Sequence, residues 1–369
     1  MARRKNDPSA VRIERLLGEI RRRRVQAMLI TDPVDVGYLS GFTGDDSWLL
    51  VGSEQPCLLL TDFRYAEQAE RECPHLARVV RTKSMIEALA AVVRKRRVAS
   101  LGFDPESVTV GLRARLAKGL GRRVHLAAVR GVLSGLRIRK DESEIRAIRR
   151  AVAVAESAFN EFRRCVRIGM TERRLAAELD YRMRLAGADA PAFPTIMAVG
   201  PSAAMPHYRP GDRRLRQGSV LLVDFGARAG GYVCDLTRVL FAGRIRPHVA
   251  SVYALVQEAQ AAAIEAARPG AALAEVDAAA RSRIEAAGFG RQFRHGTGHG
   301  LGREVHEAPA LARGVKGRLE PGMVVTIEPG IYLTGRFGVR LEDDILITPG
   351  GPEVLTHLAK DPQAMVLDI

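Results

Sequence analysis

The chain has 369 residues, of which 47% are hydrophobic and 27% are charged, a composition typical of a folded protein with two domains and not of a disordered one. The net charge of +15 would suit a nucleic-acid partner, but 50 of the 57 basic residues are arginines scattered along helix-like stretches, so we expect no nucleic-acid partner. No apolar run reaches the roughly eighteen residues of a membrane-spanning helix, so we also expect no membrane partner.

The first third of the chain alternates predicted helices and strands. A helix around Val11–Arg23 is followed by strand-like apolar runs at Ala27–Ile30, Trp48–Val51 and Cys57–Thr61. The alternation continues with a helical stretch near Tyr65–Arg71, a strand at Val98–Phe103 and a helix at Val108–Ala117. This order predicts a smaller α/β domain over residues 1–132. Its histidines and acids form no dense cluster, so we expect it to make oligomer contacts and one wall of a site.

A second domain is predicted over residues 133–369, after a boundary near Val132–Lys140. The acids of residues 141–144 suit the first turn of a helix that continues to about Phe162, and Thr171 is typical of the N-cap of a second helix. Strands that contain two acids follow at Ser219–Phe241. Two more helices, and then strands with two more acids, are predicted at Val249–Ala267, Leu273–Ala287 and Met323–Leu346.

These elements make two successive passes of helix, helix, strands and acidic pair. Each pass has an acid with a glycine two residues later, Asp224 with Gly226 and Glu328 with Gly330, followed by a glycine-containing loop and a second acid. The second acid follows the first by eleven residues in one pass and by fourteen in the other. We therefore predict a duplicated α+β domain with a pseudo-twofold axis, near which the acids meet.

The four acids of the two passes lie at the ends or centres of apolar, strand-like runs, where isolated carboxylates would be costly to bury. A bound cation is the natural explanation. Gly230-Gly231 supplies the turn of a hairpin, so we expect Asp224 and Asp235 to occupy facing positions on its two arms. Glu328 and Glu342 are expected to meet in the same way across the loop at Gly335–Gly338.

Four carboxylates and a histidine from His295-Gly296-Thr297-Gly298-His299 provide hard oxygen donors with one nitrogen. That donor set favours manganese, cobalt or iron ions over a thiolate zinc site. Two divalent ions would offset four carboxylates, whereas one ion would leave the cluster strongly negative. We therefore prefer a site with two ions.

These motifs resemble those of the pita-bread metallopeptidase family, in the branch that holds aminopeptidase P and prolidase. The resemblance covers nearly the whole chain, including an N-terminal domain similar to that of creatinase and prolidase. The family order Asp, Asp, His, Glu, Glu implies a two-metal site in this chain with the ligands Asp224, Asp235, His299, Glu328 and Glu342, in the contexts VDFG, CDLTR, HGTGHGLG, TIEPGIY and VRLEDD. The cofactors implied are two divalent ions per chain, for which we expect Mn²⁺, with Co²⁺ or Zn²⁺ as alternatives.

The resemblance also implies roles for residues outside the ligand set. His207, His295 and His306 resemble the family's catalytic histidines, and Arg340 resembles the arginine that supports the bridging glutamate and the substrate's carboxyl end. Glu328 would also shuttle a proton from water to the leaving nitrogen. Three neighbours have structural interpretations: Tyr232 packs in the hairpin, Cys234 faces the core, and Asp344 supports the site.

The implied reaction is hydrolysis of the peptide bond before proline in short proline-containing peptides. The runs Tyr38–Gly44 and Thr61–Tyr65 are more similar to small bacterial aminopeptidase P enzymes, so we prefer an Xaa-Pro aminopeptidase. An Xaa-Pro dipeptidase (prolidase) is the alternative, and a catalytically silent binding module is a third reading. The four cysteines have no metal-ligand spacing, and no secretory signal opens the chain, so we expect a cytoplasmic setting. Family habit implies a homodimer.

Overall fold

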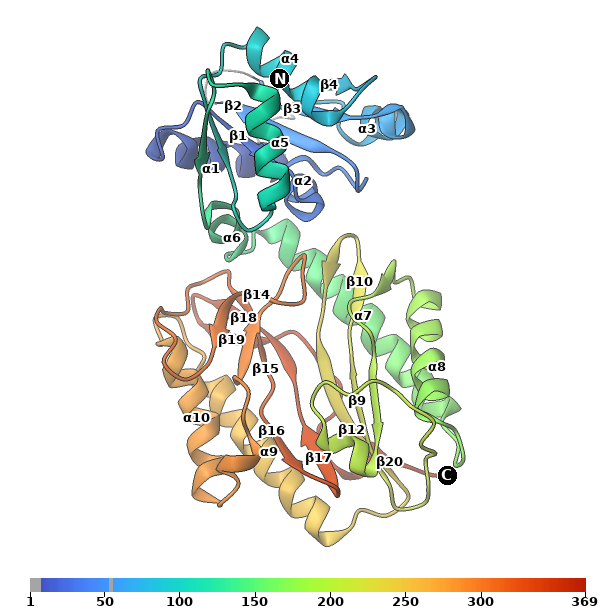
Figure 1. Cartoon of the computed structure of the whole chain (residues 1–369). Coiled ribbons are helices and arrows are strands. Elements are labelled where there is room, and N and C mark those ends of the chain that lie inside the picture. The colour runs from blue at the N-terminus through green and yellow to red at the C-terminus, as the bar shows by residue number, and fades with distance from the viewer. Residues whose placement is uncertain (1–7, 53–55) are drawn as a thin grey trace. The chain divides into compact units, whose positions relative to one another are not determined.

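The computed structural model describes residues 8–52 and 56–369, and the chain divides between Arg137 and Ile138 into two compact units (Figure 1). Among those residues no helix has both the length and the apolarity needed to cross a membrane.

The first unit is an α/β domain built on one sheet of six strands in the order β4-β3-β2-β1-β5-β6. Its strands are β1 (Ala27–Ile30), β2 (Trp48–Gly52), β3 (Leu58–Thr61), β4 (Ala77–Val80), β5 (Ser100–Phe103) and β6 (His125–Ala128). Its helices are α1 (Pro8–Arg22), α2 (Pro33–Ser40), α3 (Ala66–Glu72), α4 (Met85–Lys95), α5 (Val110–Leu120) and α6 (Val132–Arg137). The predicted α/β alternation is confirmed, with three helices, α2, α4 and α6, that the sequence analysis missed.

Both faces of this sheet are covered by helices. Met28 and Ile30 of β1 pack into one apolar cluster with residues of α1 and α2, whereas Ala27 and Leu29 pack into a second cluster with residues of α4 and α5. Successive side chains of a strand point to opposite faces, so one continuous apolar run supplies both cores.

The second unit carries four long helices, α7 (Glu142–Cys165), α8 (Glu172–Leu185), α9 (Pro247–Ala266) and α10 (Leu273–Ala286). The α7 helix begins with a capping box between Asp141 and Glu144, and Thr171 caps α8 through a hydrogen bond from Arg174 N, as the sequence predicted. In Figure 1 the green α7/α8 pair lies beside the yellow-green strands, and the α9/α10 pair lies beside the orange-red strands.

Two sheets of the second unit follow the same order, which confirms the predicted repeat. One sheet has the order β20-β12-β9-β8 and the other the order β14-β13-β15-β18-β19. The first contains β8 (Ile196–Val199), β9 (Val220–Phe225), β12 (Leu236–Ala242) and β20 (Val366–Leu367). The second contains β13 (Gly298–Gly300), β14 (Glu307–Leu311), β15 (Val324–Ile327), β18 (Asp343–Thr348) and β19 (Gly351–Val354). The run β8-β9-β12 therefore corresponds to β13-β15-β18.

A short hairpin extends each half beyond its sheet. In the first half it is formed by β10 (Ala227–Ala229) and β11 (Tyr232–Val233), with β7 (Ala190–Pro191) at its edge; in the second it is formed by β16 (Gly330–Leu333) and β17 (Phe337–Arg340). The halves meet where an isolated antiparallel bridge pairs Thr237 with Glu342. Two of the expected ligands, Asp224 and Glu342, therefore lie where strands of the two halves come together.

Candidate metal centre

A cavity of about 470 Å³ in the second unit brings together all nine residues that the sequence analysis assigned to a site. The five expected ligands lie on its wall with the three histidines and Arg340. The rest of the wall is partly apolar and includes Phe193, Pro194 and Ile196, which the sequence analysis did not single out. An apolar wall beside a group of charged side chains suits a small ligand with both kinds of surface.

The first acidic hairpin has the expected turn but a different register from the one expected. Gly230 and Gly231 both have positive φ, 59° and 77°, and Ala229 pairs with Tyr232 on either side of them, which is the geometry of a two-residue turn. Continued outward, this register pairs Asp224 with Thr237. Asp235 therefore lies two residues from the position opposite Asp224. The two carboxylates are diagonal neighbours, and the expectation that they face each other is wrong.

The second pair of acids is closer to the arrangement expected. Ile327 pairs with Asp343 and Gly330 pairs with Arg340, so the same register places Glu328 across from Glu342. Thr237 joins this pair to the first hairpin, because its hydroxyl donates a hydrogen bond to Glu342 Oε2 at 2.6 Å. The threonine that faces Asp224 thus orients a carboxylate of the other half.

His299 reaches the acids from β13. Its Nδ1 lies 3.1 Å from Gly300 O, which assigns the ring hydrogen to Nδ1 and leaves the Nε2 lone pair directed at the acids. Nε2 is 3.5 Å from Glu328 Oε1 and 3.7 Å from Asp235 Oδ2. Donor atoms of Asp235, His299 and Glu342 lie within 4.8 Å of one another, as ligands of one ion would.

A close backbone approach fixes the strand that carries His299. A Cβ atom on Gly298 would lie 1.8 Å from Thr326 O, so only glycine fits at this position. The hydroxyl of Thr326 accepts a hydrogen bond from His299 N at 3.1 Å. The glycine pattern around His299 therefore has a packing reason, since it lets β13 lie against the strand that leads to Glu328.

The cavity contains more carboxylate groups than its own cations can neutralise, so bound metal ions would stabilise it. Within the part of the chain that the structure describes, Asp224 Oδ1 and Asp235 Oδ1 are buried without a hydrogen-bond partner. Burial and repulsion from neighbouring carboxylates raise the pKa values of Asp235 and Glu342 well above the usual range, and burial raises the pKa of Glu328 to about 7. Burial lowers the pKa of His299 to about 4, which keeps the imidazole neutral and able to coordinate. The donor set therefore fits divalent metal ions.

Arg340 is a buried cation of the cavity wall, which the exposed Arg209 also lines. It pairs with Asp224, and its Nε donates to Thr237 Oγ1 at 3.0 Å, so it supports Glu342 through the threonine. Its Nη1 donates to the hydroxyl of Tyr332 at 2.8 Å. The sequence analysis missed the roles of Thr237 and Tyr332, although both residues lie inside the motifs that it quoted.

The three histidines occupy different surroundings. Tyr332 accepts a hydrogen bond from Arg340, so its own hydrogen goes to His295 Nε2 at 2.9 Å, while His295 Nδ1 lies 2.8 Å from Gly296 O. Both ring nitrogens are thus engaged, and burial lowers the pKa of His295 to about 4. The ring of His306 lies beside that of His299, with ring centres 4.4 Å apart and an angle of 59° between the ring planes.

His207 lies on a loop that a buried carboxylate holds. Glu172, at the start of α8, accepts hydrogen bonds from Tyr208 Oη at 2.7 Å, Gly211 N at 3.0 Å and Val199 N at 2.9 Å. In the sequence, Glu172 stands out only as an acid in the first turn of α8. Its second function, which is to fix the loop around His207, depends on contacts 27 to 39 residues away along the chain.

The remaining acids and neighbours are structural. Asp344 Oδ2 accepts a hydrogen bond from Asp235 N at 3.1 Å, Tyr232 donates to Glu144 Oε1 at 3.1 Å, and Cys234 is buried, with its sulfur accepting a hydrogen bond from Ala227 N. These positions agree with the structural interpretation given to each residue.

The duplicated fold and its cavity together form a candidate site for divalent ions among carboxylates. Metallopeptidase family M24 matches residues 146–349, and the Creatinase/Prolidase N-terminal domain matches residues 12–139. The chain therefore belongs to metallopeptidase family M24.

Named relatives cover nearly the whole chain. An Xaa-Pro dipeptidase of Pyrococcus horikoshii is 34% identical over 95% of this chain and 98% of its own. The structure of an Xaa-Pro dipeptidase from Bacillus anthracis has a TM-score of 0.93 and 33% identity over 97% of this chain and 100% of its own. The structure of an X-Pro aminopeptidase from Thermotoga maritima has a TM-score of 0.89 and is 37% identical over 95% of this chain and 99% of its own.

Proposed function

We propose that this chain is an Xaa-Pro dipeptidase, which hydrolyses the bond between an N-terminal residue and a following proline. The observation that carries the proposal is the single cavity in which the five expected ligand residues, three further histidines and Arg340 meet. The sequence analysis preferred an Xaa-Pro aminopeptidase, and that preference is not confirmed. The similar proteins from Pyrococcus horikoshii and Bacillus anthracis bear the name dipeptidase, and this favours the alternative.

We propose that Asp224, Asp235, His299, Glu328 and Glu342 hold two divalent ions, with Mn²⁺ as the expected metal and Co²⁺ or Zn²⁺ as alternatives. When bound, such ions lower the pKa of water and stabilise the negative charge that develops on a cleaved carbonyl group. The carboxylate of Glu328 lies on the cavity wall among the proposed ligands, where it could take a proton from water and deliver it to the leaving nitrogen.

The other wall residues have matching roles in the proposal. His306 lies beside His299 and can donate a hydrogen bond to the developing oxyanion. Arg340 and His207 present positive or polar groups to the carboxylate of a short peptide. His295 holds the hydroxyl of Tyr332 and, through it, Arg340, so we assign it the task of orienting the wall rather than transferring protons.

An Xaa-Pro aminopeptidase is the second candidate, and one observation favours it. The Thermotoga maritima structure, at 37% identity, bears that name. The two activities share their chemistry and differ in whether the substrate continues beyond proline. A silent binding module would keep the fold without turnover, and it is disfavoured by the complete set of ligand residues around the cavity.

The deciding experiment compares an Xaa-Pro dipeptide with the matching Xaa-Pro-Yaa tripeptide, with Mn²⁺ supplied. A dipeptidase cleaves the dipeptide and leaves the tripeptide largely intact, whereas comparable cleavage of both would establish the aminopeptidase. E328Q should abolish turnover of either substrate, and E258Q, on the exposed face of α9, should retain it. If the wild-type protein cleaves neither peptide, the peptidase proposal fails.

We also propose a homodimer, which rests on family habit, and a cytoplasmic setting, which suits the four free cysteines. Sedimentation velocity of the purified chain tests the first of these: a single species with the mass of one 40.2 kDa chain would contradict it.

A further inference from the structure

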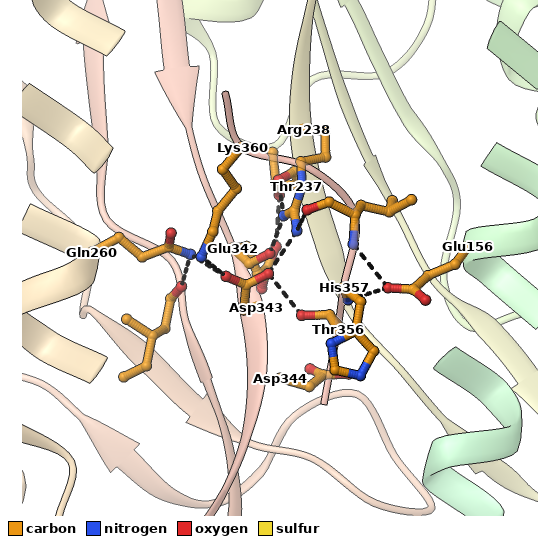
Figure 2. A network of polar contacts seen from close by, with 12 residues as sticks. Glu156, Thr237, Arg238, Gln260, Glu342, Asp343, Asp344, Thr356, His357 and Lys360 are labelled. Atoms are coloured by element: carbon orange, nitrogen blue, oxygen red, sulfur yellow. Dashed lines mark hydrogen bonds and ion pairs between the residues drawn. The ribbon is translucent and has the colours of Figure 1, made fainter. Parts of the chain in front are cut away.

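Behind the metal centre lies a buried polar network centred on Asp343, the residue after Glu342 (Figure 2). Asp343 is fully buried and is not part of the cavity wall. Its Oδ1 accepts hydrogen bonds from Arg238 Nη2 and Thr356 Oγ1, both at 2.7 Å. Its Oδ2 accepts one from Gln260 Nε2 at 3.1 Å and pairs with the ammonium group of Lys360. One carboxylate thus collects four side chains from distant parts of the second unit.

The same side chains hold the backbone next to two of the proposed metal ligands. Arg238 Nη1 donates to Glu342 O at 2.6 Å, and the amide of Gln260 donates to Ile327 O at 3.1 Å, one residue before Glu328. Arg238 also follows Thr237, whose hydroxyl orients the carboxylate of Glu342. A change at Asp343 would therefore reach both glutamates through one or two hydrogen bonds.

Lys360 reaches this network from a segment without regular structure that follows β19. The segment is firmly attached on both sides of the lysine side chain. Leu358 O accepts a hydrogen bond from Arg238 Nη2 at 2.9 Å, and Lys360 O accepts one from Tyr253 Oη at 3.0 Å. Leu358 N donates to Glu156 Oε1 at 3.0 Å. The ammonium group is therefore presented to Asp343 by a fixed backbone, so that only the lysine side chain loses conformational freedom when the pair forms.

The charges explain why a second cation is needed. Arg238 divides its hydrogens between Asp343 and three carbonyl groups, those of Thr237, Glu342 and Leu358. Within the network, the ammonium group of Lys360 pairs with Asp343 alone. The side chain of Lys360 is 27% exposed, whereas the side chains of Arg238 and Asp343 are fully buried. Without Lys360, the Oδ2 atom of Asp343 would keep only the neutral amide of Gln260, and a buried carboxylate would lose half of its charge compensation.

We propose that Lys360 is a positioning residue of the metal centre: it holds Asp343 and, through Asp343 and Arg238, sets the backbone at Glu342 and Glu328. The inference rests on the proposed function, because it presupposes that these glutamates bind metal ions. Residues that orient metal ligands typically change metal affinity 10- to 100-fold when removed. Lys360 reaches the ligands only through Asp343 and Arg238. We therefore expect its removal to weaken metal affinity about tenfold, the lower end of that range.

The test is a calorimetric titration of the metal-free protein with Mn²⁺, which needs no peptide substrate. K360M should bind Mn²⁺ about tenfold more weakly than the wild type, and K360R, which keeps the charge, should restore most of the affinity. K316M removes an exposed lysine of the same unit and should bind like the wild type. If K360M does not fold, K360Q keeps a shorter hydrogen-bond donor without the charge and should show the same loss.

The outcomes separate this inference from the proposed function. Wild-type affinity in K360M, or in K360Q where K360M does not fold, would overturn the positioning role even if the variant melted at a lower temperature, because that pattern marks a purely structural contact. A loss that K360R does not recover would also overturn it. Absence of Mn²⁺ binding by the wild-type protein would overturn the metal centre itself, and with it this inference.

Discussion

Metal binding should depend steeply on pH, and Glu328 supplies the magnitude. In the metal-free protein, burial raises its pKa to about 7 from an ordinary value of 4.5. A raised carboxylate pKa means that the folded protein holds a proton below pH 7, which an incoming ion must displace. Between pH 8 and pH 6 the ionised share of Glu328 falls from about nine-tenths to about one-tenth, so the apparent affinity should fall about tenfold, or ~1.4 kcal/mol.

The other proposed ligands either add to this loss of affinity at low pH or leave it unchanged. Asp235 and Glu342 also have raised pKa values, so protons on them add to the loss of affinity at low pH. His299 does not oppose it, because burial lowers its pKa to about 4 and the ring stays neutral from pH 6 to pH 8. Tenfold is therefore a lower bound.

Titration with Mn²⁺ at pH 6, 7 and 8, in pairs of buffers with different ionisation enthalpies, measures both the affinity and the protons released. We expect about half a proton from Glu328 at pH 7 and nearly a whole one at pH 6. E328Q should bind more weakly and with a flatter pH profile, whereas E258Q should keep the wild-type profile. Equal affinity at pH 6 and pH 8, without proton release, would refute the reasoning, because Glu328 would then be ionised in the folded, metal-free protein.

Three substitutions test the supporting contacts. T237V removes the hydroxyl that orients Glu342, and we expect about tenfold weaker Mn²⁺ binding by calorimetry; unchanged affinity would contradict that role. Y332F breaks the link between His295 and Arg340, and it should lower kcat/KM about tenfold and stability in urea by about 1–3 kcal/mol. E172A leaves three donors around the His207 loop unpaired and should lower the free energy of unfolding by about 3 kcal/mol; a loss below 1 kcal/mol would show that water replaces the carboxylate.

The residues proposed as ligands could be picked out of the sequence because each lies in a short motif, and the structure brings all five to one cavity. The relative position of Asp224 and Asp235 was also within reach. A two-residue turn at Gly230-Gly231 pairs Ala229 with Tyr232, and counting outward pairs Asp224 with Thr237 rather than with Asp235. Two acids on the arms of one hairpin need not face each other, because the turn fixes which residues pair.

The contacts that hold the proposed ligands in place could not be predicted from short motifs in the sequence. Arg238 and Asp343 are 105 residues apart, and Gln260 lies 83 residues from Asp343. Lys360 comes from an irregular segment that no periodicity marks. Such contacts depend on how the two halves pack, and a single sequence carries no local sign of that packing. The missed helix α4 is different, since Ser84 and Glu87 form a capping box that the sequence displays.

Without bound ions, the fold must accommodate the mutual repulsion of the four carboxylates that are proposed to bind them. Four carboxylates converge where the halves meet at Thr237 and Glu342, yet Arg340 neutralises only Asp224 directly. Burial raises the pKa of all four carboxyl groups, that of Asp224 in spite of Arg340, so protons can take the place of cations in the metal-free fold. Binding of the ions would then displace these protons. The network of Arg238, Asp343 and Lys360 would keep the backbone of the glutamate ligands in place during this exchange. We therefore expect two separate contributions to the affinity for the ions: the pH sets how many protons must be displaced, and the network behind the glutamates sets how well the ligands are positioned.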